Sequence, residues 1–425
     1  MCQIMTKKVF YILWMPFLLA IGGCSEDPAS EPALLPDRLS PYALFPNDVA
    51  ANDSASAYVA NGLQYLVHPK ASYTLSFDKD ASIKKNPTLH LFRLGSELDD
   101  GRISTGHVRA LEGREENGRL VYDFVCEESE RSVWISSLVL DGEIYKGTTH
   151  HVKLTADGPY SDTLSINLIV VGKIDFKEPD MNVELFAQKL LEGFRKYYTS
   201  IVIDTLYVRY AHEHPTLGSK YPADQLWLAG RTSSDYFVSD LGGWPEPGLK
   251  NALDIVLVHR IELDYVLGYS MMYSGNLYDG KGSTVVIGAY SKNSSGENGL
   301  TSSSIISTAL HETGHFLGLR HTTTTQADYE ATLDFSNYED GFTDTPYCSE
   351  LQQSGLLKRH DEGPVVDFEL PLFRGVFASS NQAFDMNGCP DFRNIMFPAV
   401  NDERMEGFSA QQLAHIRKNL RVFPH

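Results

Sequence analysis

The segment from His311 to His321 constrains the fold of this chain more than any other feature of its 425 residues. It reads His-Glu-Thr-Gly-His-Phe-Leu-Gly-Leu-Arg-His and overlaps a run, 302–317, whose apolar residues recur at helical spacing. Residues four apart lie on one face of a helix, so His311 and His315 can offer two imidazoles to one Zn²⁺. The pattern predicts a helix over 302–317 that carries two metal ligands.

The residues around and after this helix predict a third ligand and a catalytic base. Gly318 permits the left-handed turn that ends a helix, which lets His321 return towards the first two histidines. Three protein ligands leave one position open for water and substrate, as a catalytic zinc site requires. Glu312 lies beside the ligands and can act as general base. The alternative is a helix with surface histidines, which the apolar flanks and the added Gly and His disfavour.

Composition limits the number of domains and the class of partner. A chain of this length exceeds one ordinary domain, and a hydrophobic fraction of 42% is enough for a buried core. The net charge of −19 argues against a nucleic-acid partner, because phosphate binding needs a clustered positive surface. We therefore expect two globular domains and no nucleic acid.

The N-terminal residues predict a lipid anchor. Lys7 and Lys8 precede an apolar stretch, 9–21, that has the length of a signal-peptide core. The stretch ends in Ile-Gly-Gly-Cys, which resembles the lipobox of bacterial lipoproteins, and the resemblance implies a signal peptide over 1–23 with a lipid on Cys24. An uncleaved anchor or plain secretion is the alternative.

Behind this anchor, a flexible tether is expected over 24–40. The lipid alone would attach the protein to the bacterial cell envelope, at the outer membrane and exposed on the cell surface.

Short β-rich runs predict a first domain over 41–175. Turn signals such as Glu116-Asn117-Gly118 separate the runs, and this spacing predicts a small antiparallel, immunoglobulin-like β-sandwich. The runs are 63–67, 73–77, 88–94, 120–125, 133–140, 152–155 and 164–171. No catalytic constellation occurs among them.

The pattern changes near Pro179, and residues 176–425 alternate between helical and strand-like segments. Further helices are expected over 183–198 and from Ser409, where Ser409 and Gln412 fit a capping box. Strands are expected over 201–210, 253–258 and 284–290. The alternation predicts an α/β or α+β domain that contains the histidine-bearing helix.

The extended motif of His311 to His321 resembles the zinc motif of the metzincin peptidases. Their second feature is the Met-turn, which places a methionine beneath the zinc histidines, and Asn394-Ile395-Met396-Phe397-Pro398 is similar to it in order and distance. The resemblance implies a metzincin-type zinc peptidase domain with a mixed twisted sheet, in which Met396 shapes the base of the site. Met396 as ordinary core is the alternative. Pro398 departs from the family, many members of which have there a tyrosine that can assist the transition state.

Within the metzincins, residues 305–420 are most similar to the pappalysin family, including its cytophagalysin-like bacterial members. The segment 340–346, Asp-Gly-Phe-Thr-Asp-Thr-Pro, resembles the family's Asp-Thr-Pro segment. The resemblance suggests Ca²⁺ binding by Asp340 and Asp344, with a solvated acidic loop as the alternative.

Three cysteines follow Cys24 in the sequence. Cys348 and Cys389 fall where the pappalysin family commonly places paired cysteines, and an oxidising compartment favours a disulfide between them over two buried thiols. A second cysteine pair of some relatives is missing. Cys126 reads as a small buried apolar residue rather than a nucleophile.

The order of elements in metzincins implies a substrate-binding edge. In the family, the strand before the last one runs antiparallel at the sheet edge beside the cleft, and an extended peptide can add to it through main-chain hydrogen bonds. By order, residues 267–273 would form that edge, and a plain loop is the alternative because of Gly268 and Gly275. The candidate substrate contacts are Leu267, Tyr269, Met271 and Tyr273.

Together these features predict a zinc endopeptidase that cleaves extracellular or surface proteins. One alternative is a surface binding lipoprotein with a catalytically silent zinc domain, although a scaffold has no need for the base Glu312. Another is a zinc amidase that acts on cell-wall peptides.

Overall fold

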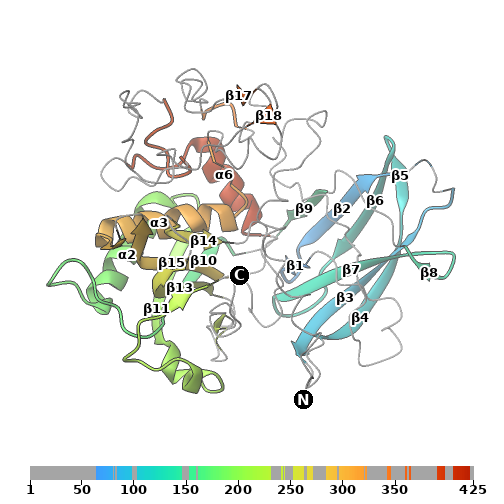
Figure 1. Ribbon diagram of the computed structural model, residues 1–425. Helices are drawn as coiled ribbons and strands as arrows, with labels where there is room; N and C mark the ends of the chain where they lie inside the picture. The colour runs from blue at the N-terminus through green and yellow to red at the C-terminus, as the bar shows by residue number, and fades with distance from the viewer. Residues whose placement is uncertain are drawn as a thin grey trace, which may run out of the picture.

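The computed structural model has two lobes, one built from strands alone and one from a sheet and helices (Figure 1). The described residues are 64–79, 81, 84–97, 103–145, 153–158, 161–230, 241–242, 244, 252–262, 266–270, 284–293, 296–319, 321–322, 342–345, 359–360, 363–364, 390–397 and 405–421. The expected signal peptide, Cys24 and the tether lie outside them. Among these residues, no helix has the length and apolar character needed to cross a membrane.

Two antiparallel sheets form the first lobe, and they share one core. The sheet orders are β1-β7-β3-β4, with β8 on β7, and β5-β6-β2-β9. Tyr73, Leu91 and Trp134 come from different strands and are all buried in this core. The strands are β1 (Gln64–Val67), β2 (Ser72–Asp78), β3 (Thr88–Glu97), β4 (Ile103–Glu112), β5 (Arg114–Glu116), β6 (Arg119–Val125), β7 (Ser132–Leu140), β8 (Glu143–Ile144) and β9 (Lys153–Asp157). The lobe is a β-sandwich, and its immunoglobulin-like character stays a prediction.

The second lobe is built on a mixed sheet of seven described strands. Its order is β11-β10-β13-β15-β14, with β12 on β13 and β16 on β15. β10, β11, β13 and β15 run parallel, whereas β14 runs antiparallel to β15 at the end of the order. The strands are β10 (Thr163–Val170), β11 (Val202–Tyr210), β12 (Leu228–Ala229), β13 (Leu253–Ile261), β14 (Gly268–Ser270), β15 (Thr284–Asn293) and β16 (Gly296–Gly299).

The place of β10 corrects the expected domain boundary at residue 175. The sequence prediction counted residues 164–171 with the sandwich, but Leu168 of β10 pairs with Val208 of β11 and Ile255 of β13 in the mixed sheet. An apolar strand has the same pattern whichever sheet it joins, so only its position along the chain suggested the first lobe. The boundary between the two sheet systems lies between β9 and β10.

Helices cover one face of the mixed sheet, and a second core covers the other. Leu168 and Ile255 point to the helix-covered face, where they pack with Leu310. Val256 points to the opposite face and packs with Trp244. The alternation follows from the two-residue period of a strand. The helices on the first face are α2 (Val183–Tyr197), α3 (Ser302–Phe316) and α6 (Ala410–Asn419).

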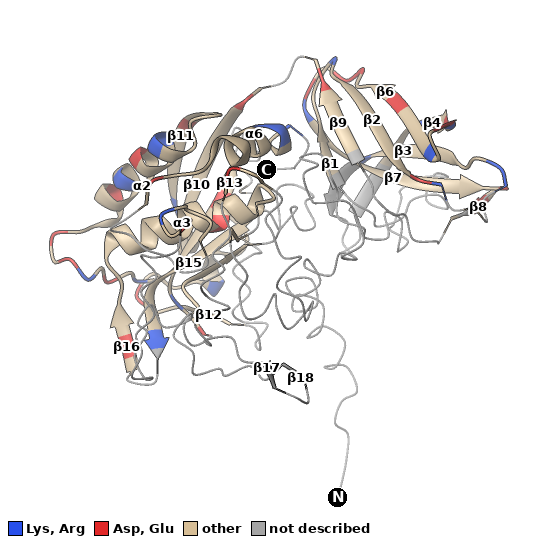
Figure 2. Ribbon diagram, turned by 90° about the horizontal axis from the view of Figure 1, so that it is seen from above, with Lys and Arg blue, Asp and Glu red and all other residues tan. Residues whose placement is uncertain are grey.

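Helix termini carry the caps that the sequence predicts. The Thr301 side chain accepts a hydrogen bond from the Ser304 amide at the start of α3. Ser409 and Gln412 form a complete capping box at the start of α6. The outer face of α2 carries charged side chains of both signs (Figure 2). The remaining described elements are short: η2 (Ala211–Glu213), η3 (Gly218–Lys220), β17 (Arg359–His360) and β18 (Gly363–Pro364).

Candidate metal centre

Helix α3 carries the first two histidines and is fixed at its beginning. The Glu178 carboxylate accepts hydrogen bonds from the Ser302 amide at 2.7 Å and the Ser302 hydroxyl at 3.0 Å. A carboxylate at this end also interacts favourably with the helix dipole. Because Glu178 follows β10 along the chain, this contact ties the metal-binding helix to the central part of the sheet.

The turn after α3 brings His321 back towards the helix. Gly318 has φ of +84°, the left-handed conformation predicted for the residue that ends the helix. The Leu319 amide donates to the Gly314 carbonyl at 2.9 Å, and the Thr322 amide donates to the Met396 carbonyl at 3.1 Å. The second bond holds the segment that contains His321 against the chain around Met396.

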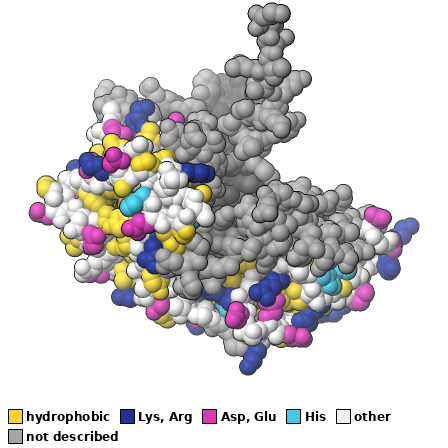
Figure 3. Space-filling view, turned by 90° about the horizontal axis from the view of Figure 1, so that it is seen from below, with side chains coloured by type: hydrophobic (Ala, Val, Ile, Leu, Met, Phe, Trp, Pro, Cys, Tyr) yellow, Lys and Arg dark blue, Asp and Glu magenta, His cyan; other side chains and the backbone are white. Residues whose placement is uncertain are grey.

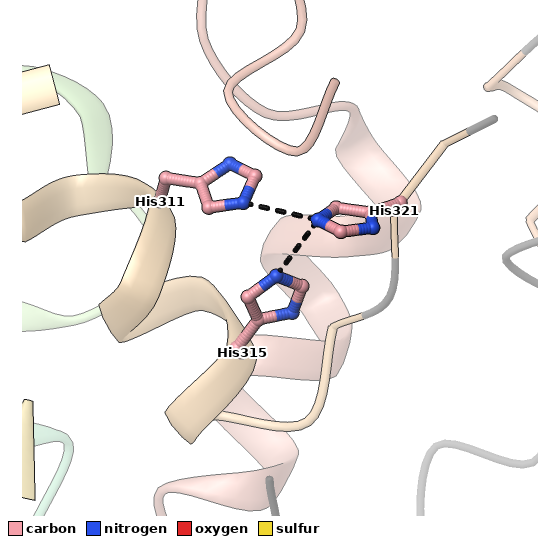
Figure 4. Close-up of side chains that lie close together, drawn as sticks. All are labelled: His311, His315 and His321. Carbon is pink, nitrogen blue, oxygen red and sulfur yellow. Dashed lines mark hydrogen bonds between the residues drawn. The ribbon is translucent and has the colours of Figure 1, made fainter. Parts of the chain in front are cut away.

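The three imidazole rings meet at their Nε2 atoms (Figure 4). The Nε2 atom of His321 lies 3.2 Å from that of His311 and 3.1 Å from that of His315. Two ligands of a tetrahedral Zn²⁺, each about 2.0–2.1 Å from the metal, are about 3.3 Å apart. All three ligand atoms lie within 4.8 Å of one another, and no other such group of three occurs in the part of the chain that the structure describes.

Main-chain carbonyls hold two of these rings from behind. The Nδ1 atom of His311 lies 2.7 Å from the Ile395 carbonyl oxygen, and that of His315 lies 2.8 Å from the Leu319 carbonyl oxygen. A carbonyl only accepts, so both Nδ1 atoms carry the proton and both Nε2 atoms present a lone pair to the centre. This second contact is the one that metal-bound histidines commonly make.

Burial keeps the first ligand neutral. His311 is buried, and desolvation together with the neighbouring His321 lowers the pKa of its imidazole to about 3. A neutral imidazole is the form that binds a metal. The donor set therefore fits a divalent cation that accepts nitrogen ligands.

Met396 packs beneath the helix at the position that the Met-turn prediction gives it. A side chain added at Gly314 would overlap the Met396 sulfur, so the thioether lies directly against the helix backbone between the two histidines. The Asn394 side chain accepts from the Met396 amide at 2.8 Å and donates to the Gln412 side chain of α6 at 2.8 Å. Pro398 lies outside the described residues.

The Glu312 side chain extends from α3 towards the edge strand β14. A Cβ atom at Gly268 would be 2.9 Å from Glu312 Cγ, so only a glycine allows the strand and the glutamate to come this close. Burial raises the pKa of the Glu312 carboxyl to about 8, and the nearby Ser270 hydroxyl opposes this shift. A nearby divalent cation lowers the pKa of a carboxyl group.

The predicted antiparallel edge is present as β14, whose residues Gly268 to Ser270 pair with Ile287 to Val285. Tyr269 is exposed, and the Leu267 carbonyl accepts a hydrogen bond from the Gly288 amide at 2.9 Å. The other two candidate substrate contacts, Met271 and Tyr273, lie outside the described residues.

Asp344 has a structural contact at the N-terminus of α6. Its two carboxylate oxygens accept hydrogen bonds from the Ser409 hydroxyl at 2.7 Å and the Gln411 amide at 2.9 Å. Asp340, Cys348 and Cys389 lie outside the described residues, so the calcium site and the disulfide stay predictions. Cys126 is buried and is not part of a disulfide.

Several residues that support the site were not predicted in that role. No sequence pattern marks Glu178 as the hydrogen-bond partner of Ser302. Gln412 was predicted only as part of the capping box of α6. The Tyr198 hydroxyl donates to the Leu310 carbonyl at 2.6 Å, one residue before His311. A buried tyrosine needs such a partner, but the sequence does not reveal which carbonyl accepts.

Comparisons with known proteins add little to this geometry. No protein-family model matches the chain, and no curated protein matches it. One similar structure is the M60 catalytic domain from Clostridium perfringens ZmpC in complex with the sialyl T antigen, at 10% identity and a TM-score of 0.16, covering 64% of this chain and 51% of that one. Another is an acetyl xylan esterase from the rumen bacterium Butyrivibrio proteoclasticus, at 11% identity and a TM-score of 0.11, covering 46% of this chain and 55% of that one.

The chain spans about half the length of each of these two structures. TM-scores this low leave the fold and function of the chain to be argued from its own residues. Those residues give a centre in which three histidines can hold a metal ion beside a partly buried glutamate.

Proposed function

We propose that this chain is a zinc-dependent endopeptidase of the metzincin type, with a pappalysin-like catalytic domain. One observation carries the proposal: three Nε2 atoms converge while main-chain carbonyls fix the protons of two of the rings on Nδ1. Lone pairs that face one another in this way call for a cation between them. Three nitrogen ligands with an open fourth position are typical of catalytic zinc.

Glu312 is the group proposed to move protons. Zinc, when bound, lowers the pKa of a coordinated water and polarises the scissile carbonyl. Glu312 takes a proton from the attacking water and delivers it to the leaving amine. Burial raises the pKa of this carboxyl and a bound cation lowers it, and these opposing influences favour a group that can both accept and return a proton.

The edge strand β14 is the proposed substrate-binding edge. It runs antiparallel to β15 at the end of the sheet order and contacts Glu312 through Gly268. An extended peptide that pairs with this edge would pass beside the base. If the predicted lipid anchor places the protein on the cell envelope, the substrates are extracellular or surface proteins.

The test compares wild type with Glu312→Gln on an unbiased peptide library, with zinc content measured in both. We expect kcat/KM to fall by about 10²–10⁴-fold while zinc stays bound. The matched control is Glu192→Gln, the same substitution at an exposed position of α2, which should leave activity unchanged.

Other outcomes point elsewhere. Zinc-loaded wild type that cleaves no peptide contradicts the proposal and favours the binding lipoprotein. Cleavage of cell-wall peptide fragments in place of protein-derived peptides favours the zinc amidase. Equal cleavage by wild type and Glu312→Gln removes Glu312 from the mechanism.

A further inference from the structure

The side chain of Ser270 lies at the end of β14, on the face of the strand that meets α3. Side chains two apart on a strand point to the same face, so Ser270 points the same way as Gly268. A Cβ at Gly268 would lie 2.6 Å from Thr308 Cγ2 and 2.9 Å from Glu312 Cγ, both on α3. This close approach brings the Ser270 hydroxyl into the space between the edge strand and the helix.

The Ser270 hydroxyl oxygen is shielded from solvent and makes no hydrogen bond within the described residues. Glu312 lies on the helix that faces this side of the strand, and the nearby Ser270 hydroxyl lowers the pKa of its carboxyl against the effect of burial. A buried hydroxyl usually has a partner, since leaving it without one is unfavourable, and the Glu312 carboxylate is an acceptor on the facing helix.

We propose that Ser270 is a positioning residue that donates a hydrogen bond to one carboxylate oxygen of Glu312 and thereby fixes the orientation of the general base. The inference rests on the proposed function and deepens it. With one oxygen occupied by the Ser270 hydroxyl, the carboxylate can rotate less, and the second oxygen is the one that accepts the proton from water.

This arrangement also links the base to the proposed substrate edge. Ser270 pairs with Val285 across the β14–β15 ladder, so its backbone position is set by the sheet. A peptide that adds to β14 therefore binds to the same strand that orients Glu312. The hydroxyl belongs to a strand of the sheet, whereas the base belongs to the helix packed against it, so a hydrogen bond between them would join the two elements.

Three variants of the full chain test the proposal: Ser270→Ala, Ser270→Thr and Ser137→Ala. Ser137→Ala is the matched control, because Ser137 also has a buried hydroxyl without a described partner, but on β7 in the sandwich. Zinc content, melting temperature, kcat and KM are measured on a peptide that wild type cleaves.

We expect Ser270→Ala to lower kcat about tenfold or more, the size expected for a lost hydrogen bond to a charged group, with KM, zinc content and melting temperature unchanged. Ser270→Thr keeps the hydroxyl and should retain most of the wild-type kcat. Ser137→Ala should match wild type in kcat.

The inference is overturned if Ser270→Ala cleaves like wild type, if Ser270→Thr is as slow as Ser270→Ala, or if Ser270→Ala loses zinc or melts lower, which would indicate a structural role. A wild type that binds zinc but cleaves nothing instead refutes the proposed function, and the inference with it.

Discussion

Each lobe brings histidine rings into contact, but the two groups differ in chemistry. In the sandwich, His90 Nδ1 on β3 and His107 Nε2 on β4 are 3.3 Å apart, and histidine side chains are visible on that lobe, to the right in Figure 3. In the second lobe, His311, His315 and His321 meet at similar distances.

The surroundings of the rings make the difference. The sandwich pair is satisfied when one neutral ring donates an N–H to the other, and no third ligand joins it within the described residues. In the second lobe, carbonyls hold the protons of His311 and His315 away from the centre. A short distance between nitrogens is therefore weak support for a metal, whereas fixed tautomers around a common centre are strong support.

The largest expected effect distinguishes these two groups directly. His315→Ala removes one of three ligands, so we expect bound zinc to fall from about one per chain to background, with loss of activity. His90→Ala removes a ring from the sandwich pair and should leave zinc content unchanged. Metal analysis of the purified proteins checks both, and a loss of zinc in His90→Ala with retention in His315→Ala would reverse the comparison.

A smaller effect is expected one layer away from the metal. Asn394→Ala removes the bond to the Met396 amide and loosens the turn whose Ile395 carbonyl fixes His311. We expect zinc affinity to fall about 10–100-fold, the usual range for residues that orient a ligand. Competition with a chelator measures it. The control is Asn298→Ala, whose side chain donates to the Gly296 carbonyl within the exposed β15–β16 hairpin, and equal affinities in the two variants would contradict the account.

The smallest of the three effects is expected when one glycine in each lobe is replaced by alanine. Alanine at Gly314 would press on Met396, and we expect the free energy of unfolding of the metal-free protein to fall by about 1–3 kcal/mol, although alanine otherwise favours helix. Gly106→Ala on β4 meets nothing within 4 Å and should be near neutral. Denaturant unfolding compares them, and a neutral Gly314→Ala would show that Met396 is not packed against the helix.

The sequence predicted local structure wherever a short segment contains its own signal. Helix α3 follows from apolar periodicity, its cap at Thr301 and its end at Gly318. The ligand set could be predicted because His311 and His315 are one helical turn apart and Gly318 permits the turn that returns His321 to them. The capping box of Ser409 and Gln412 is equally local.

Features that depend on contacts distant along the chain were missed or misplaced. β4 was not predicted, because Ile103–Glu112 mixes Gly106 with polar residues and is supported by pairing with β3. β10 was assigned to the wrong lobe. The hydrogen bond from Ser302 to Glu178 and the close approach of Gly268 to Glu312 join segments whose proximity only the fold creates.

X-ray absorption at the zinc edge tests the central claim most directly. In protein loaded with one equivalent of Zn²⁺, the account predicts a first coordination shell of three imidazole nitrogens at about 2.0–2.1 Å and one oxygen from solvent. A sulfur-containing shell, a shell of oxygens alone, or fewer than three imidazoles would contradict it, because each would place the metal somewhere other than among His311, His315 and His321.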